Sequence, residues 1–229
     1  MAIITISRGT FAGGQKLAET LAKRLGYRTV SREYLYQTVL EQYGLQYGEL
    51  MQFLEEAPTL RAMCAGERQD RASVGERRRQ LFTAVRASLC ELVKDDNVVY
   101  HGYAGHLLLP GVSHVVRVRL IAPRPKRIEM AMARETLSRA DASRKIDQVD
   151  GERARWTQAF FGVNWGDPLL FDIVINLENV GIDEATELLE AIAKLPRFRA
   201  TEESLASMRE LAARSKAEAR QVTAARAVE

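Results

Sequence analysis

A glycine-containing segment near the start of the chain has the composition of a phosphate-binding loop. Residues 7–16 follow an apolar stretch at residues 2–6 and precede an amphipathic helix that ends at Gly26. A loop between a strand and a helix directs backbone N–H groups and the positive end of the helix dipole at an anion. We therefore expect it to bind the phosphates of a nucleotide. The expected contributors are Arg8, Gly9, Gly13, Gly14, Gln15 and Lys16.

This loop lacks part of the P-loop pattern G-x-x-x-x-G-K-[ST]. Gly9 and Gly14 have the spacing of the pattern, but Gln15 stands at the lysine position. Lys16 stands where a hydroxyl residue would hold Mg²⁺. Arg8 and Lys16 are the cations available to replace the lysine, and we expect Lys16 to act in catalysis. A plain structural turn is the alternative interpretation.

A second segment, at residues 150–156, carries two arginines beside an aspartate. Arg153 and Arg155 are two positions apart, so on a helix they face different sides. Phosphoryl transfer depends mainly on positioning and on positive charge at the transferring oxygens. We expect both arginines to act in catalysis from a lid at residues 134–167 that excludes water. An ordinary charged helix is the alternative.

Apolar stretches alternate with helical patterns along the chain, which indicates a parallel sheet. Ligands of such sheets bind at the carboxyl ends of the strands, where we expect Arg32 to face the same cleft as Gly102 and Tyr103. The predicted fold is a three-layer α/β/α sandwich around a five-stranded parallel sheet. Strands are predicted near residues 2–6, 27–30, 97–102, 115–122 and 171–176, and helices near 34–43, 77–93, 125–137 and 182–193.

The composition restricts the class of protein. The 229 residues are 46% hydrophobic and 28% charged, and the net charge is only +3, so we expect no broad nucleic-acid surface. Cys64 and Cys90 lack the spacing of metal ligands, so we expect no metal site built from protein side chains. The N-terminal apolar stretch is short and does not resemble a signal peptide, and no stretch is long enough to span a bilayer. We expect a cytoplasmic protein.

Three regions are predicted along the chain. The main domain covers residues 1–195 and includes a helical insertion at about 34–76, which binds the acceptor substrate. Arg61, Arg68, Arg71 and the Arg77-Arg78-Arg79 run make this insertion locally basic. Two interpretations stay open: the arginines lie on a solvated helical face, or one or two of them reach an acceptor phosphate. Residues 196–229 form a helical tail whose narrow apolar stripe is a candidate contact for a homodimer.

The residues at positions 1–195 together resemble the cytidylate-kinase-like branch of the P-loop nucleoside monophosphate kinases. The match rests on three groups in this order: Ile6-Ser7-Arg8 with Gly13-Gly14 and Leu17-Ala18, then Gly102 with residues 105–109, then Asp150-x-x-Arg153-x-Arg155 with residues 165–168 and Asp172. The resemblance implies ATP with Mg²⁺ as the donor and a CMP-like nucleoside monophosphate as the acceptor. It also implies that Arg32, Gly102, Tyr103 and Asp150 bind the acceptor.

The chain departs from this family at several positions that matter for chemistry. Aligned on Gly13, authentic cytidylate kinases place the loop lysine at Gly14, and the kinase-like branch commonly has an arginine where this chain has Gln15. Phe11 stands at a position that is usually glycine. Tyr103 stands where an arginine is expected, and Ser31 where an aspartate is usual. Loss of a charge beside the transferred phosphate is costly to catalysis. Two hypotheses follow: an ATP-dependent phosphotransferase, or a nucleotide-binding regulatory module with little or no turnover.

Overall fold

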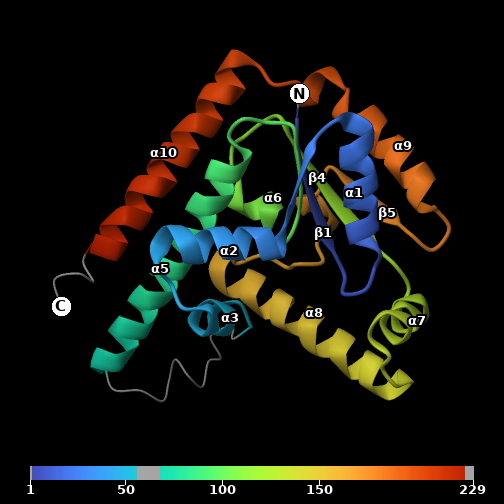
Figure 1. Ribbon diagram of the computed structural model, residues 1–229, viewed down its shortest axis with the longest axis horizontal. Helices are drawn as coiled ribbons and strands as arrows, with labels where there is room; N and C mark the ends of the chain where they lie inside the picture. Colours follow the sequence, from blue (N-terminus) through green and yellow to red (C-terminus); the bar gives the residue numbers. More distant parts are fainter. Residues whose placement is uncertain (1, 56–67, 225–229) are drawn as a thin grey trace.

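The centre of the molecule is a five-stranded, fully parallel sheet (Figure 1). The computed structural model describes residues 2–55 and 68–224, with side chains described at 2–54 and 76–220. Within these residues the strand order is β2-β3-β1-β4-β5. The strands are β1 (Ile3–Arg8), β2 (Arg28–Ser31), β3 (Val98–His101), β4 (Val115–Ile121) and β5 (Ile173–Asn176).

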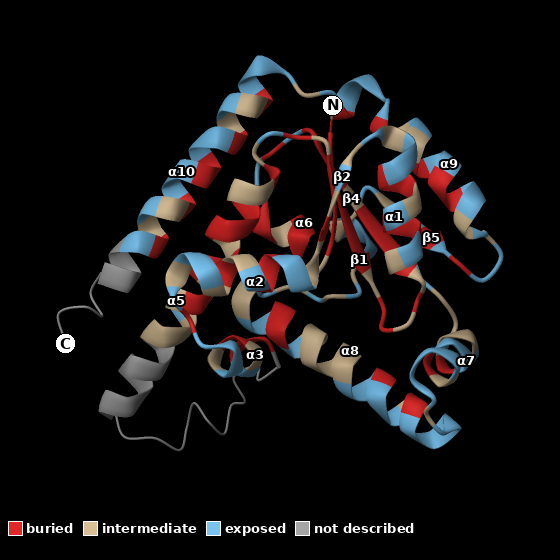
Figure 2. Ribbon diagram, viewed as in Figure 1, coloured by how far each residue is buried: buried red, intermediate tan, exposed pale blue. Residues whose placement is uncertain are grey.

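Helices cover both faces of the sheet and complete three layers (Figure 2). Side chains alternate along a strand, so Ile3 of β1 faces one layer while Ile4 and Ile6 face the other. The Ile4 side packs against α1 (Gly14–Leu25) and α9 (Ile182–Ala193). The Ile3 side packs against α2 (Arg32–Tyr43), α3 (Tyr47–Glu55), α5 (Arg68–Val93), α6 (Gly105–Leu108), one end of α8 (Arg139–Phe161) and α10 (Glu202–Ala224).

The predicted lid is a helical hairpin with a small core of its own. The hairpin is made of α7 (Arg124–Glu135) and the first half of α8, and it begins ten residues before the predicted lid at residue 134. Ile128 and Ala131 of α7 pack against Ala142 and Ile146 of α8. The other end of α8 is anchored in the main core by Trp156, which is 1% exposed. The lid is therefore continuous with the domain.

The predicted insertion between the second and third strands is helical where the structure describes it. It consists of α2, α3 and the start of α5, and α3 packs against α8. Ser31 begins α2, because its hydroxyl accepts the backbone N–H of Tyr34 at 3.1 Å. The expectation that basic residues here reach a phosphate falls partly outside the described residues, as do Pro58, Arg61 and Gly66 and the side chains of Arg68 and Arg71.

The predicted helical tail is present, but its apolar stripe is used within the chain. Met208, Leu211 and Ala212 of α10 are buried in the same core as the α5 residues, and Arg86 of α5 pairs with Glu218. Packing of α10 on α5 buries the apolar stripe that was the candidate contact with a second copy of the chain. The stripe therefore packs within the chain, and a homodimer contact through the C-terminal helix stays a prediction.

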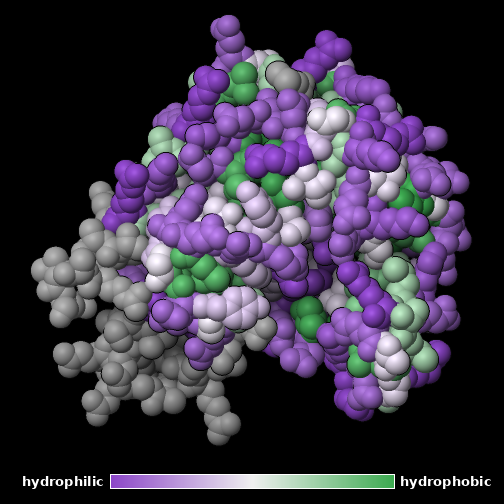
Figure 3. Space-filling model, in the orientation of Figure 1, coloured by the Kyte–Doolittle hydropathy of each residue, from purple (hydrophilic) through white to green (hydrophobic). Residues whose placement is uncertain are grey.

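No helix among the described residues is long and apolar enough to cross a bilayer. On the face shown in Figure 3, hydrophilic side chains cover most of the area and apolar side chains form separate patches.

The packing of α10 predicts a large stability effect at Leu211, which is 4% exposed. Leu211→Ala should lower the free energy of unfolding by about 3 kcal/mol, because it removes a buried side chain and leaves a cavity. Leu188→Ala on α9 is the matched control, since Leu188 is 48% exposed, and it should change stability by less than about 1 kcal/mol. Urea unfolding measures both. Equal losses would contradict the buried position of α10.

Candidate functional site

A cavity of about 60 Å³ lies at the carboxyl edge of the sheet. It is reached by the ends of three strands, because Arg8 ends β1, Arg32 follows β2 and Gly102 follows β3. This is the edge at which parallel α/β sheets bind ligands. The volume has room for several waters or a phosphate-sized group. The lining residues are Ser7, Arg8, Arg32, Gly102, Tyr103, Ala104, Arg153, Thr157 and Trp165.

Three arginines converge on this cavity, and no carboxylate is among its lining residues. Arg8 is held by a hydrogen bond from its guanidinium to the carbonyl oxygen of His101 at 3.2 Å. Burial lowers the pKa of Arg8 to about 10, and the charges of Arg153 and Arg32 lower it further in the same direction. All three groups remain charged at neutral pH. Their mutual repulsion makes the cavity a favourable place for an anion.

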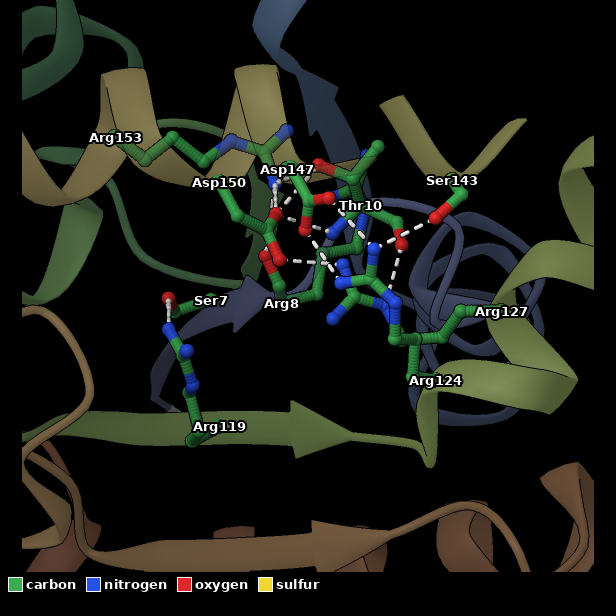
Figure 4. A network of polar contacts seen from close by, with 10 residues as sticks. All are labelled: Ser7, Arg8, Thr10, Arg119, Arg124, Arg127, Ser143, Asp147, Asp150 and Arg153. Carbon is green, nitrogen blue, oxygen red and sulfur yellow. Dashed lines mark hydrogen bonds and ion pairs between the residues drawn. The ribbon is translucent and has the colours of Figure 1, made fainter. Parts of the chain in front are cut away.

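Arg153 reaches the cavity from α8 and is fixed to the glycine loop. Its guanidinium donates to the carbonyl oxygen of Arg8 and to the hydroxyl of Thr10, each at 3.0 Å (Figure 4). Asp150, one turn earlier, accepts the backbone N–H of Thr10 at 2.9 Å and its hydroxyl at 2.7 Å. Asp150 also pairs with Arg127 of α7. These contacts join the lid hairpin to the loop.

The glycine loop itself has the geometry that precedes a helix N-terminus. Gly13 is the N-cap of α1 with φ of 79°, a left-handed conformation that favours glycine. The first N–H groups of α1, from Gly14 onward, have no partner within the helix. Gly9 lies under the guanidinium of Arg127, because a Cβ at Gly9 would come within 3.1 Å of that group. Gln15 accepts a hydrogen bond from Arg134 of α7 at 2.7 Å.

The family model for the cytidylate kinase-like family matches residues 3–179 of this chain. This range includes all five strands, the glycine loop and the lid hairpin. The chain belongs to the cytidylate kinase-like family.

Named relatives and solved structures agree with this assignment. Cytidylate kinases from Sulfurisphaera tokodaii and Thermococcus kodakarensis are 24% and 22% identical over 189 residues, which cover 82% of this chain and 93% and 86% of theirs. An uncharacterized protein from Eubacterium ventriosum aligns over 84% of this chain and 97% of its own, with 18% identity and a TM-score of 0.59. Shikimate kinase from Bacteroides thetaiotaomicron aligns over 85% and 99%, with 16% identity and a TM-score of 0.50. These structures show the P-loop kinase fold.

One departure from the family has a direct steric explanation. A Cβ on Gly14, where the resemblance places the loop lysine, would lie 2.3 Å from Cδ of Arg8. A lysine at position 14 and Arg8 in its present position therefore exclude each other. On its way to the cavity, the side chain of Arg8 occupies the space that the first atoms of a lysine side chain at position 14 would need. The family member described here thus brings a cation of β1 to this edge of the sheet.

Two further departures do not block the cavity. Phe11 has φ of 59°, which explains why glycine is usual there. Its ring packs against the small core of the α7–α8 hairpin and so contacts the lid. Tyr103, at the position of the expected arginine, lines the cavity and packs edge-on against Trp156 at 5.1 Å between ring centroids. Gly102 is required by Tyr100, whose hydroxyl would lie 2.2 Å from a Cβ at position 102.

The predicted site residues divide into those that meet at the cavity and those that do not. Arg8, Arg32, Gly102, Tyr103 and Arg153 line it. Arg155 is exposed on α8 and outside the lining, because two helical positions separate it from Arg153 by more than half a turn. Lys16 is also exposed and outside the lining. Gly9, Gly13, Gly14, Gln15 and Asp150 belong to the loop and its contacts with the lid.

Two arginines beside the site, one buried and one half-buried, were not predicted from the sequence. Arg119 of β4 donates to the hydroxyl of Ser7 at 3.0 Å and stacks over Trp165 at 3.9 Å. Its signal was an arginine within the apolar stretch of β4. Arg127 binds the loop carbonyl of Thr10 at 2.8 Å, and nothing in its sequence surroundings indicates this. Thr157 and Trp165 were also missed as lining residues.

The residues present do not fit a Mg²⁺ ion held by the protein. Mg²⁺ prefers oxygen ligands such as carboxylates and hydroxyl groups. The carboxylate at the loop, Asp150, already pairs with Arg127 and lies 3.6 Å from the guanidinium of Arg153. The guanidinium groups of Arg127 and Arg153 beside this carboxylate would repel a Mg²⁺ ion. Among the described residues no cluster of three His, Cys, Asp or Glu side chains could hold a metal ion either.

A buried histidine near the site predicts a pH dependence of stability. His106 packs on Phe171 at 4.5 Å between ring centroids. Burial, and then the charges of Arg119 and Arg117, lower its pKa to about 3. In the unfolded chain His106 binds a proton near pH 6.5, whereas in the folded chain it stays neutral down to about pH 3. The contribution of His106 to the free energy of unfolding is therefore fully present above pH 6.5 and is lost as the pH drops towards 3. Between pH 7 and pH 5 the loss should be about 2 kcal/mol.

His106→Leu isolates this contribution, because leucine is apolar and does not titrate. The difference in unfolding free energy between pH 7 and pH 5, measured by urea titration, should be about 2 kcal/mol smaller in the variant than in the wild type. An unchanged difference would show that His106 does not remain neutral in the fold.

Proposed function

We propose that this protein is an ATP-dependent phosphotransferase whose acceptor is a nucleoside monophosphate of the CMP type. The observation that carries the proposal is the convergence of Arg8, Arg32 and Arg153 on one cavity with no carboxylate in its lining. Membership of the cytidylate kinase-like family supports the class of reaction, and the two cytidylate kinases among its relatives support the acceptor.

The roles of the arginines follow from the elements that carry them. Arg32 begins α2 on the insertion side, so we assign it to the phosphate of the acceptor. Arg153 comes from the lid and contacts the loop, so it lies between acceptor and donor and would stabilise the charge of the transferring group. Arg8 would supply positive charge from β1 at a site where authentic cytidylate kinases use a loop lysine. Guanidinium groups suit this task because they bind two phosphate oxygens at once.

The donor would bind at the glycine loop. The free N–H groups at the start of α1, from Gly13, Gly14 and Gln15, are suited to the phosphates of ATP. Mg²⁺ would arrive on the nucleotide, since the protein offers no ligand set for it. The α7–α8 hairpin lies over the loop and would exclude water during transfer. ATP as donor is consistent with a cytoplasmic location, which we propose together with nucleotides as the partners.

The second candidate is a nucleotide-binding regulatory module without turnover. Two observations favour it: position 14 is a glycine and provides no positive charge, and Lys16 is exposed outside the cavity lining. The two candidates differ in phosphotransfer and agree in binding.

Arg153→Ala tests the catalytic proposal, with Arg155→Ala as the matched control on the same helix. Arg153→Ala should lower the rate of ATP-dependent CMP phosphorylation at least about tenfold, equal to roughly 1.4 kcal/mol of barrier, and mainly through kcat. Arg155→Ala should stay near the wild-type rate, because that side chain is exposed outside the cavity lining. A coupled assay of ADP formation measures both.

The assay also separates the two candidate functions. A contaminating kinase would give the same rate in all preparations, so the signal must disappear in Arg153→Ala. Wild-type protein that binds ATP and CMP but phosphorylates neither CMP nor other common monophosphates would favour the regulatory module.

Arg32→Ala tests the acceptor side. It should weaken binding of CMP about tenfold in calorimetry, because Arg32 lines the cavity from the insertion side. Binding of ATP should change less than about twofold, because none of the loop contacts involves Arg32. An equal loss for both ligands would place Arg32 elsewhere in the reaction.

A further inference from the structure

The glycine loop is already bound by an anion from its own chain. The Asp150 carboxylate accepts the Thr10 backbone N–H at 2.9 Å and the Thr10 hydroxyl at 2.7 Å through the same oxygen. Its other oxygen accepts a hydrogen bond from Arg127. The guanidinium of Arg153 lies 3.6 Å away. A backbone N–H, a hydroxyl and two guanidinium groups are the donors that typically surround a bound phosphate.

We propose that Asp150 is an internal ligand of the phosphate-binding loop and that the phosphates of the donor nucleotide must displace it. The carboxylate mimics a phosphate, and its removal frees Thr10, Arg127 and Arg153 to bind the incoming anion. The α7–α8 hairpin thus regulates access to the loop. This inference rests on the proposed function only in its assumption that the loop binds phosphate.

The hairpin is built to move without unfolding the domain. Its core consists of only four buried residues, and Phe11 of the loop packs against it. The polar contacts beyond this core, of Arg124 with Asp147 and Ser143 and of Lys145 with Glu135, are on the surface and weak. The far end of α8 remains anchored by Trp156 in the main core. A shift of the first half of α8 would withdraw Asp150 while Trp156 stays in place.

The charges on either side favour such an exchange. Asp150 contributes one negative charge among Arg127, Arg153 and the nearby Arg8 and Arg119. A polyphosphate carries several negative charges and more acceptor oxygens, so it satisfies these guanidinium groups better than one carboxylate does. The cost is the separation of Asp150 from its partners. Because of this cost, the apparent affinity of the loop for phosphate equals its intrinsic affinity multiplied by the fraction of molecules in which Asp150 has left the loop.

The test is binding of inorganic tripolyphosphate to Asp150→Asn at fixed ionic strength, measured by calorimetry. Asparagine keeps the size of the side chain but removes the charge that competes with phosphate. We expect affinity to rise at least about tenfold over the wild type. Asp147→Asn is the matched control: it lies one turn away on α8, also loses a charge paired with an arginine, and contacts Arg124 rather than the loop. It should change affinity less than about twofold.

An equal gain in both variants would show a general charge effect and overturn the proposal, as would unchanged or weaker binding in Asp150→Asn. If Asp150→Asn does not fold, hydrogen exchange of the wild type decides. With tripolyphosphate, amides of α8 around Asp150 should exchange faster while those at the start of α1 exchange more slowly. Unchanged or slower exchange around Asp150 overturns the proposal.

The result is independent of the proposed activity. Tighter binding in Asp150→Asn without phosphotransfer by the wild type would support the internal ligand and count against the kinase. Phosphotransfer by the wild type with no gain in Asp150→Asn would support the kinase and reject the internal ligand.

Discussion

An excess of positive charge at the carboxyl end of β1 determines how the surrounding elements are arranged. Arg8, Arg119, Arg127 and Arg153 come from four different elements, and Arg127 and Arg153 share Asp150 as the carboxylate at the loop. Each guanidinium is tied to backbone or hydroxyl oxygen: Arg8 to His101, Arg119 to Ser7, Arg127 and Arg153 to the loop. These neutral acceptors hold the cations together without cancelling their charge. The fold therefore maintains a site with an excess of positive charge, which favours the binding of an anion.

The position of the missing lysine shows how a site can change while the fold is kept. A P-loop lysine extends from the first turn of the helix that follows the loop. Here Gly14 has no side chain, and the side chain of Arg8, from the preceding strand, occupies the space beside it. The charge comes from the opposite side of the loop, with a planar group in place of a point charge.

Much of the fold could be predicted from the sequence because its pattern is strong and local. Parallel strands buried on both faces are continuous apolar stretches, and all five were located to within two or three residues. The segment of α9 at residues 182–193 agrees with its prediction at both ends. The beginning of α5 was missed by nine residues, because its polar first turns lack an apolar period.

The site was only partly predictable, since it depends on contacts between distant segments. The convergence of Arg32 with Gly102 and Tyr103 was predicted because both segments follow strands at the carboxyl edge of the sheet, and the structure brings these residues together. Arg127 and Asp150 meet the loop over more than a hundred residues of sequence, and only the packing of α7 on α8 places them there. Lys16 and Arg155 carry the right charge, but their helical positions direct them to solvent.

The pairing of α10 with α5 has a consequence for biosynthesis. One of the two large cores includes Cys90 from α5 and Met208 and Leu211 from α10, so it is complete only when the chain has been translated past residue 211. Domains fold as units once their contacts are available. The emerging polypeptide therefore exposes one apolar flank of this core until α10 has been translated. Chaperone dependence of this protein should concentrate in that interval on the ribosome, with α10 acting as the segment that ends it.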